Sequence, residues 1–254
     1  MKLALIPSRE CLYDQAVRTG YHLLLPQHTD DPLYGGFYMR RRAEGDFLML
    51  DNGACEGHLV SNEELMQTAN TYMVNEIVVP DVLCDMEATL NLVKGFQDVA
   101  LNSPEFNYMG VLQGLTMAEL LECLRMYAQM SYISTIAIPR HVETTVGYGT
   151  RWRIVRHIRE HYSFPQGPHY QIHLLGTNPA YINELIVHNR DYEDAGVRGV
   201  DTASPYYYAM NGKLIKDLEG CKRPDDYYNH KFTKSEHQLA KANTSEVSLW
   251  TRGS

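Results

Sequence analysis

Short apolar segments recur along the chain at nearly regular intervals, and this spacing limits the fold more than any other feature. Each segment is five to seven residues long, too short for a typical helix, and most are rich in branched residues, which favours strands. Their near-continuous apolar character is typical of a parallel sheet that is covered on its outside. Eight such segments occur, at residues 2–7, 21–26, 47–51, 76–81, 108–114, 133–139, 170–176 and 197–201.

Amphipathic segments lie between most of these strands and predict helices. The first opens with Ser61 and has glutamates in its first turn, which indicates a capped helix start. Residues 27–46 contain no clear helix, which makes the second strand the least certain one. The predicted helices are residues 61–75, 85–101, 116–130, 150–162 and 178–189.

Strands that alternate with helices in this number predict a (β/α)8 TIM barrel, for which ~250 residues is typical. The chain has 254 residues. A doubly wound open sheet is the alternative, but no GxGxxG loop follows the first strand. We assign residues 1–220 to the barrel, and the more polar residues 221–254 to an appended helix and a loose tail.

The cysteines and the apolar segments bear on where the chain works. No apolar run approaches the ~20 residues that span a bilayer, so we expect no membrane partner. The five cysteines are scattered, with no CxxC pair, which indicates reduced thiols and a cytoplasmic location. Cys221, His230 and His237 form a loose group that could hold a metal ion, although their spacing matches no familiar site.

Three of the apolar segments end in an aspartate: Asp51, Asp81 and Asp201. Because catalytic groups of a barrel stand at the carboxyl ends of its strands, these carboxylates should meet at one rim. Aspartates after strands also serve as helix N-caps and turn formers, and for any one of them that role is equally reasonable. Their combination favours a functional site. Other strands end in or near Gln113, Gly114, Arg140 and Gly176.

Two carboxylates and an amide support a limited range of chemistry. A pair of carboxylates can break a glycosidic bond, one attacking the anomeric carbon while the other moves protons. A glutamine and an aspartate can read a purine edge, since the amide donates to O6 and the carboxylate accepts from N1–H and the 2-amino group. These residues therefore permit glycosyl transfer on a guanine nucleoside, and equally sugar hydrolysis or a metal-assisted reaction.

Several short motifs resemble those of the queuine and archaeosine tRNA-guanine transglycosylases. "DNGACEG" is similar to the DSGGFQ-type loop of that family, "GVLQG" to its VQGG motif and "HLLGT" to its LMG or LFG motif. "GVDTASPYYYA" resembles the FDSAS-type motif of the archaeal branch, and "IAIPR" lies where the family has a short apolar strand. The motifs follow the order of the family over residues 47–210.

The resemblance implies roles for the acidic residues. Asp201 matches the nucleophile that attacks C1′ of the target nucleotide and expels guanine. Asp51 matches the general acid/base that acts on the exchanging bases. Asp81 matches the aspartate that reads the base, with Asp85 as a rival for this role.

The resemblance also implies the residues that bind the base. Gln113 and the backbone of Gly114 match contacts to the purine edge, and Gly176 lets the backbone approach the base. Leu175 would stack on one face of the ring. We place Asn52, beside Asp51, in the same binding set.

The sequence departs from the family pattern in three respects. Cys55 stands where relatives have an aromatic residue that sandwiches the base, so Tyr206 or Tyr207 would have to supply the second face. The zinc site of the family and any appended RNA-binding domain are absent. Such a short chain resembles the phage-encoded branch that inserts 7-deazaguanines into DNA, which favours DNA over tRNA as the substrate.

Basic residues near the rim could hold the phosphates of a nucleic acid. The net charge of −8 argues against general nucleic-acid binding, so local groups would have to provide these contacts. Candidates are Arg140, Arg151 and Arg153, with Trp152 available to stack on a neighbouring base. An ordinary solvated helix surface explains residues 150–161 nearly as well.

The sequence therefore predicts an enzyme that replaces guanine in DNA by a free 7-deazaguanine base, such as preQ0, through a covalent aspartyl–sugar intermediate and without a cofactor. One alternative is the same exchange on tRNA, and another is an N-glycoside hydrolase on the same barrel. A third is a subunit that binds a nucleic acid or a protein without catalysis.

Overall fold

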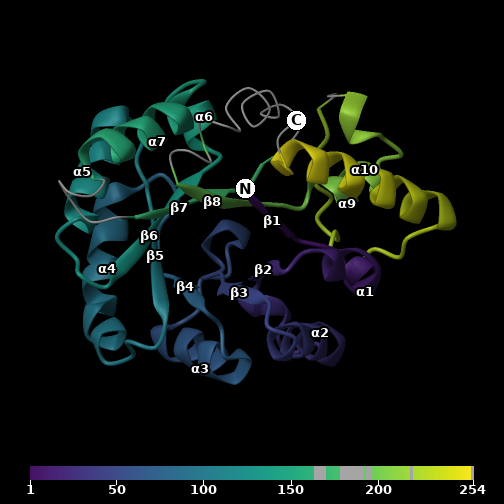
Figure 1. The fold of residues 1–254 in the computed structure, drawn as a ribbon, viewed down its shortest axis with the longest axis horizontal. Helices are drawn as coiled ribbons and strands as arrows, with labels where there is room; N and C mark the ends of the chain where they lie inside the picture. The colour runs from purple at the N-terminus through teal and green to yellow at the C-terminus, as the bar shows by residue number, and fades with distance from the viewer. Residues whose placement is uncertain (163–169, 178–191, 193–195, 218–219, 253–254) are drawn as a thin grey trace.

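Every apolar segment identified in the sequence forms a strand in the computed structural model, which describes residues 1–162, 170–177, 192, 196–217 and 220–252. All the ladders are parallel. The predicted (β/α)8 barrel is confirmed (Figure 1). The strands are β1 (Lys2–Leu5), β2 (Tyr21–Leu24), β3 (Phe47–Leu50), β4 (Glu76–Val78), β5 (Asn107–Val111), β6 (Ile133–Pro139), β7 (Gln171–Leu175) and β8 (Val197–Thr202).

The sheet is nearly closed. The ladder order is β1-β8-β7-β6-β5-β4-β3-β2, and β1 pairs with the last strand so that Lys2 lies opposite Gly199 and Ala4 opposite Asp201. β1 and β2 also contact each other, but the described residues form no ladder between them. The carboxyl ends of all strands therefore face one rim, as the sequence predicted.

Helices surround the strands, as Figure 1 shows. Four of the predicted helices are confirmed, and the one predicted at residues 178–189 lies outside the described residues. The helices are α1 (Leu12–Gln15), α2 (Pro32–Ala43), α3 (Asn62–Tyr72), α4 (Met86–Leu101), α5 (Met117–Tyr127), α6 (Val142–Thr145), α7 (Thr150–His161), α9 (Ser204–Met210) and α10 (Lys234–Arg252). Short 3₁₀ turns are η1 (Arg9–Cys11), η2 (Ala16–Arg18), η3 (Pro26–His28), η4 (Ala54–Glu56) and η6 (Ile215–Asp217).

The start of α3 is set by the cap that the sequence indicated. The Ser61 hydroxyl accepts from the backbone N–H of Glu64, and the Glu64 carboxylate accepts from the backbone N–H of Ser61. This capping box satisfies two N–H groups that have no partner within the helix.

Helix α2 is an element that the sequence reading missed in residues 27–46. Asp31 caps it and Pro32 opens it, a recognised start signal, but the Gly35–Gly36 pair weakened the helical pattern. The structure explains the first of these glycines. A Cβ on Gly35 would lie 2.4 Å from the hydroxyl of Tyr72 on α3, so the glycine allows the two helices to pack closely.

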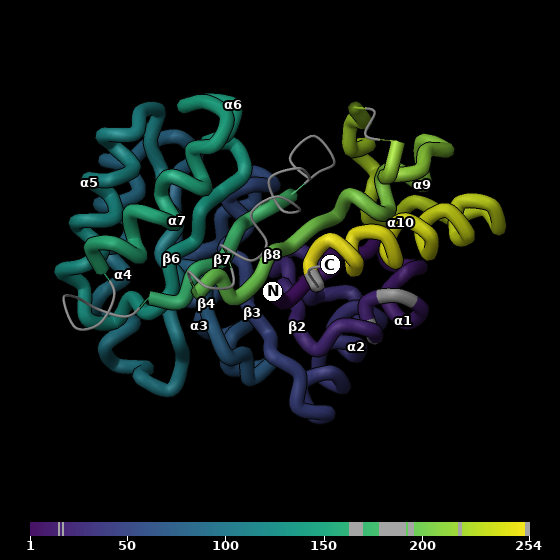
Figure 2. Tube along the Cα trace, turned by 45° about the horizontal axis from the view of Figure 1, so that its top comes forward, coloured from purple at the N-terminus to yellow at the C-terminus, as the bar shows by residue number. Residues whose placement is uncertain are grey.

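The C-terminal segment is a long helix that packs on the barrel. α10 lies beside α9 and also contacts β1 (Figure 2). Its buried side chains include Ala240, Val247 and Trp250. The sequence reading expected a helix followed by a loose tail at residues 221–254, whereas the helix extends to Arg252. Among the described residues, the helices are too short or too polar to cross a membrane.

Candidate active site

A cavity of about 480 Å³ opens at the carboxyl ends of the strands. Binding sites for small molecules commonly measure roughly 300–1,000 Å³. The cavity therefore lies where a barrel enzyme binds its substrate and has the volume for a nucleobase with its sugar. Nine of the predicted site residues line it: Asp51, Asn52, Asp81, Gln113, Arg140, Leu175, Gly176, Asp201 and Tyr207.

Asp201, at the end of β8, has one carboxylate oxygen held by two neighbours. Oδ1 accepts a hydrogen bond from the backbone N–H of Gly176 at 2.9 Å, and Nε2 of His173 lies 3.1 Å from the same oxygen. Gly176 has a φ of +71°, a left-handed conformation that glycine adopts easily. Within the described residues no hydrogen bond reaches Oδ2, so this is the oxygen that remains for a ligand.

Asp51 follows β3 and is 9% exposed. Burial raises its pKa well above the ordinary value, and the negative charges of Glu56, Asp81 and Asp201 act in the same direction. Asp51 thus retains its proton to higher pH than an exposed aspartate does. A carboxyl group with a raised pKa beside a second carboxylate is a typical arrangement for acid/base catalysis.

Asp81 lies between two amide side chains. Its Oδ1 accepts from Asn52 Nδ2 at 2.6 Å, and its Oδ2 accepts from Gln113 Nε2. The Gln113 Oε1 accepts from the backbone N–H of Cys84 at 2.8 Å, which fixes the orientation of that amide. Burial raises the pKa of Asp81, whereas the hydrogen bonds from Asn52 and Gln113 act to lower it.

Asn52 positions Asp81, because its polar atoms are already engaged within the protein. Nδ2 donates to the Val79 carbonyl at 2.7 Å as well as to Asp81, and Oδ1 accepts from the backbone N–H of Ala54 at 2.9 Å. Asn52 also lines the cavity, and its predicted contact with the substrate stays a prediction.

Two predicted positions lie away from the cavity wall. Asp85, the rival of Asp81, caps α4 by accepting from the backbone N–H of Ala88 at 2.9 Å. Gly114 is buried against α5, where an added Cβ would lie 2.7 Å from Cβ of Glu119. The cavity wall, as far as the structure describes it, includes neither residue.

The two tyrosines that were candidates for stacking on the base differ in position. Tyr206 is fully buried in the core, whereas Tyr207 lines the cavity and its hydroxyl lies 2.8 Å from the Ser204 hydroxyl. Cys55 also lines the cavity. Of the two, Tyr207 is therefore the tyrosine that could contact a bound base.

The basic residues of the rim also separate into two groups. Arg140 lines the cavity, but Arg151 is fully buried, and its Nη1 donates to the Gly176 carbonyl at 2.9 Å. Trp152 packs on the core and makes an edge contact with Tyr192, while Arg153 bonds to Thr150 in its own helix. Arg151 thus supports the loop after β7, and its predicted contact with a phosphate is wrong.

The members of the loose group formed by Cys221, His230 and His237 each have a different partner in the structure. Cys221 Sγ lies 3.7 Å from the Tyr207 carbonyl, His230 pairs with Glu236, and Nδ1 of His237 lies 3.9 Å from Cys11 Sγ. In the described ranges, no group of three or more His, Cys, Asp or Glu side chains is suitable for a metal ion.

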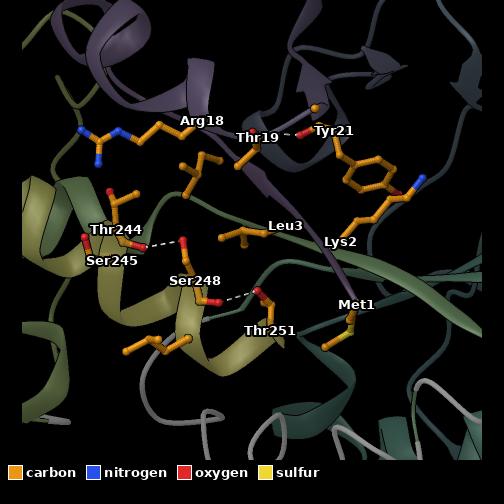
Figure 3. A pocket seen from close by; sticks show the side chains of 13 residues that line it. Met1, Lys2, Leu3, Arg18, Thr19, Tyr21, Thr244, Ser245, Ser248 and Thr251 are labelled. Carbon is orange, nitrogen blue, oxygen red and sulfur yellow. Dashed lines mark hydrogen bonds between the residues drawn. The ribbon is translucent and has the colours of Figure 1, made fainter. Parts of the chain in front are cut away.

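A second cavity, of about 520 Å³, lies at the opposite end of the barrel, between the amino ends of β1 and β2 and helix α10 (Figure 3). Several hydroxyl groups line it, but local backbone carbonyls already accept from them. Ser248 donates to Thr244 at 2.8 Å, Thr251 to Ser248 at 3.2 Å, and Thr19 to Tyr21 at 3.3 Å. This cavity lacks the carboxylates and amides of the first one.

The sequence reading missed several residues of the first cavity. Glu56, His141, Lys222 and Arg223 all line it, and Arg223 Nη1 lies 3.3 Å from Glu56 Oε1. Lys222 and Arg223 belong to the segment assigned to the C-terminal extension, and nothing in their local sequence indicates that they return to the rim.

Comparison with protein-family models and with curated protein sequences finds no match to this chain.

Proposed function

We propose that this chain is a base-exchange glycosyltransferase that replaces guanine in DNA by a 7-deazaguanine derivative. The observation that carries the proposal is the environment of Asp201. One of its oxygens is held by His173 and Gly176, and the other is open, in a cavity that also contains the buried acid Asp51. A fixed carboxylate with one open oxygen beside a carboxyl of raised pKa supports nucleophilic attack on a glycosidic carbon with proton transfer.

The proposed reaction has two displacements. In the first, Oδ2 of Asp201 attacks C1′, the C1′–N9 bond breaks with its electron pair going to guanine, and Asp51 gives its proton to the departing base. In the second, Asp51 takes the N9 proton of the incoming 7-deazaguanine, N9 attacks C1′, and the ester to Asp201 breaks. Two inversions retain the configuration at the sugar. Asp51 ends protonated, as it began, since the proton given to guanine is replaced by the one taken from the incoming base.

Base recognition would fall to Asp81 and Gln113. Each oxygen of Asp81 accepts one hydrogen bond from a protein amide and keeps a lone pair for N1–H or the 2-amino group of guanine. Gln113 Nε2 has a second N–H, which could donate to O6. Leu175 and Tyr207 line the same cavity and offer apolar surface for the faces of the ring.

The nucleic acid would reach the cavity with one nucleotide turned out of the stack, at a cost of a few kcal/mol. Arg140, Lys222 and Arg223 line the cavity and are exposed, so they are available to phosphates. We propose DNA as the substrate, with tRNA as the alternative. The free thiols fit the cytoplasm as the place of action.

Incubation with radiolabelled guanine and either duplex DNA or tRNA tests the proposal. We expect label to enter DNA, and to be chased out by an excess of an unlabelled 7-deazaguanine. Label in tRNA alone would overturn the choice of substrate. Abasic sites that accumulate in DNA without added base, with no label incorporated, would instead favour a hydrolase.

The role of Asp201 is tested by trapping. A quenched reaction with an oligonucleotide should give a covalent adduct on a denaturing gel with the wild type and none with Asp201→Asn. Asp85→Asn is the matched control, since it makes the same chemical change at an exposed helix cap, where asparagine also caps well. Equal adduct formation by Asp201→Asn and Asp85→Asn would remove Asp201 as the nucleophile.

A further inference from the structure

A row of polar side chains runs through the interior of the barrel and ends at Asp201. His173 on β7 is next to Asp201, and its Nδ1 lies 2.9 Å from the hydroxyl of Tyr21 on β2. The Nε–H of Arg198 on β8 donates to the same hydroxyl at 3.0 Å. Because these side chains come from strands on different sides of the barrel and contact one another, they meet inside it. Arg198 also bonds to Glu76 on β4 through two nitrogens.

The direction of each hydrogen bond in this row follows from Arg198. An arginine side chain has donors and no acceptor, so the Tyr21 oxygen must accept from it. The single proton of the Tyr21 hydroxyl is then directed to His173, and Nδ1 of His173 accepts it. An imidazole that accepts at Nδ1 carries its proton on Nε2, and this proton points to Oδ1 of Asp201.

We infer that His173 is a positioning residue for Asp201, held by Arg198 and Tyr21 as the neutral Nε2–H tautomer that donates to Oδ1 of the nucleophile. The catalytic part of this inference rests on the proposed function, whereas the tautomer does not. With the N–H of Gly176 as the second donor, His173 keeps Oδ1 engaged and turns Oδ2 toward the cavity.

The alternative of a doubly protonated His173 conflicts with the hydrogen bonds of Tyr21. Both Nδ1 and Arg198 would then donate to the same hydroxyl oxygen. The hydroxyl proton of Tyr21, which is only 2% exposed, would have no acceptor among the described residues. A buried donor without a partner destabilises the folded protein. Burial also raises the pKa of Tyr21 above its ordinary value, so the tyrosine keeps the proton that the row requires.

A glycine in β8 makes room for this arrangement. A Cβ on Gly199 would lie 2.7 Å from Cε1 of Tyr21 and 2.9 Å from the Lys2 carbonyl. Gly199 therefore allows the Tyr21 ring to lie against the strand that carries both Arg198 and Asp201.

The tautomer is tested directly by nitrogen NMR of the ¹⁵N-histidine-labelled protein. The signals of His173 are identified by their loss in His173→Gln. We expect Nδ1 to have the shift of an unprotonated nitrogen and Nε2 that of a protonated one near neutral pH. A protonated Nδ1, either in the other tautomer or in an imidazolium, would overturn the inference whether or not the protein exchanges bases.

The positioning role is tested on the exchange reaction with three variants. We expect His173→Leu, which removes the donor, to slow adduct formation by about 10²-fold, as a small misplacement of a reacting group does. His173→Gln keeps an N–H donor at a similar distance and should restore most of the rate. Tyr21→Phe should slow the reaction and mix the two tautomers of His173 in the NMR spectrum.

Binding of free guanine separates positioning from a general structural effect. The dissociation constant for guanine should stay unchanged in all three variants, since Asp81 and Gln113 hold the base, while the rate of adduct formation falls. A His173→Leu variant that reacts at the wild-type rate would overturn the positioning role. If His173→Leu does not fold, Tyr21→Phe takes its place in this test. A Tyr21→Phe variant with mixed His173 tautomers that forms the adduct at the wild-type rate would then overturn the positioning role. A wild type that exchanges no base at all overturns the proposed function and leaves the NMR result to judge the tautomer.

Discussion

The Glu76–Arg198 ion pair inside the barrel provides a sharp test of this architecture. Glu76 is fully buried and accepts from two nitrogens of Arg198 and from the Thr135 hydroxyl. Arg198→Met keeps much of the apolar volume of the side chain and removes the guanidinium. The Glu76 carboxylate would then remain inside the barrel with Thr135 as its one donor among the described residues.

The size of the effect follows from this burial. Removing one partner of a buried ion pair costs about 3–5 kcal/mol, because an uncompensated charge stays in the interior. For a chain of this length each kcal/mol shifts Tm by about 2–4 °C, so Tm should fall by roughly 6–20 °C. Adding Glu76→Gln to Arg198→Met neutralises the remaining charge and should recover a large part of this loss.

Thermal and urea unfolding, followed by circular dichroism, measure these changes. Arg156→Met is the matched control, because Arg156 pairs with Glu160 on the surface of α7 with both side chains about half exposed or more. Such a solvent-exposed pair contributes little to stability. Equal losses of stability in Arg198→Met and Arg156→Met would refute the reasoning. So would an Arg198→Met/Glu76→Gln double variant whose loss equals the summed losses of Arg198→Met alone and Glu76→Gln alone.

Three further predictions concern single residues. The pKa of Asp51 is raised in the folded state, so the stability that its protonation contributes is present at low pH and is lost as the pH rises through that raised pKa. Asp51→Asn should therefore become more stable relative to the wild type as the pH rises. The difference between their urea midpoints measures this change. Asp85→Ala should lose about 1 kcal/mol of stability with unchanged guanine affinity, whereas Asp81→Ala should weaken guanine binding measured by calorimetry. Gly199→Ala should lower Tm by overpacking at a cost of about 1–3 kcal/mol, while Gly95→Ala, with open space around it in α4, should raise Tm slightly.

The fold could be predicted because the apolar period of a buried parallel strand is a local property of the sequence. All eight strands and four of the helices were located in this way. α2 was missed because its inner face consists of Tyr34, Gly35, Phe37 and Tyr38, and Gly35 owes its place to a tyrosine hydroxyl of another helix. A requirement that comes from a distant neighbour leaves no periodic signal.

The rim of the site could be predicted for a similar reason, since parallel strands bring their carboxyl ends together whatever their sequence. Which residues face the cavity could not be read in this way. Asp81 and Asp85 are four residues apart and of the same type, yet one lines the cavity and the other caps α4. Arg151 has the same charge as Arg140 but is buried beneath the loop after β7.

Four polar residues of the strands were not recognised in the sequence, because the apolar pattern around them already identified the strands. Tyr21 and Glu76 begin their strands, and His173 and Arg198 lie within theirs, at positions where apolar side chains would bury more apolar area. Apolar groups of similar volume in place of a buried ion pair often leave a protein equally stable or more stable, so stability alone gives little reason to keep a charged pair in the barrel. Orientation gives a reason. An arginine can only donate hydrogen bonds, and a tyrosine hydroxyl has one proton to donate. The donor direction therefore passes from Arg198 through Tyr21 to His173, which then donates to Oδ1 of Asp201 and, in the proposed reaction, leaves Oδ2 for the substrate.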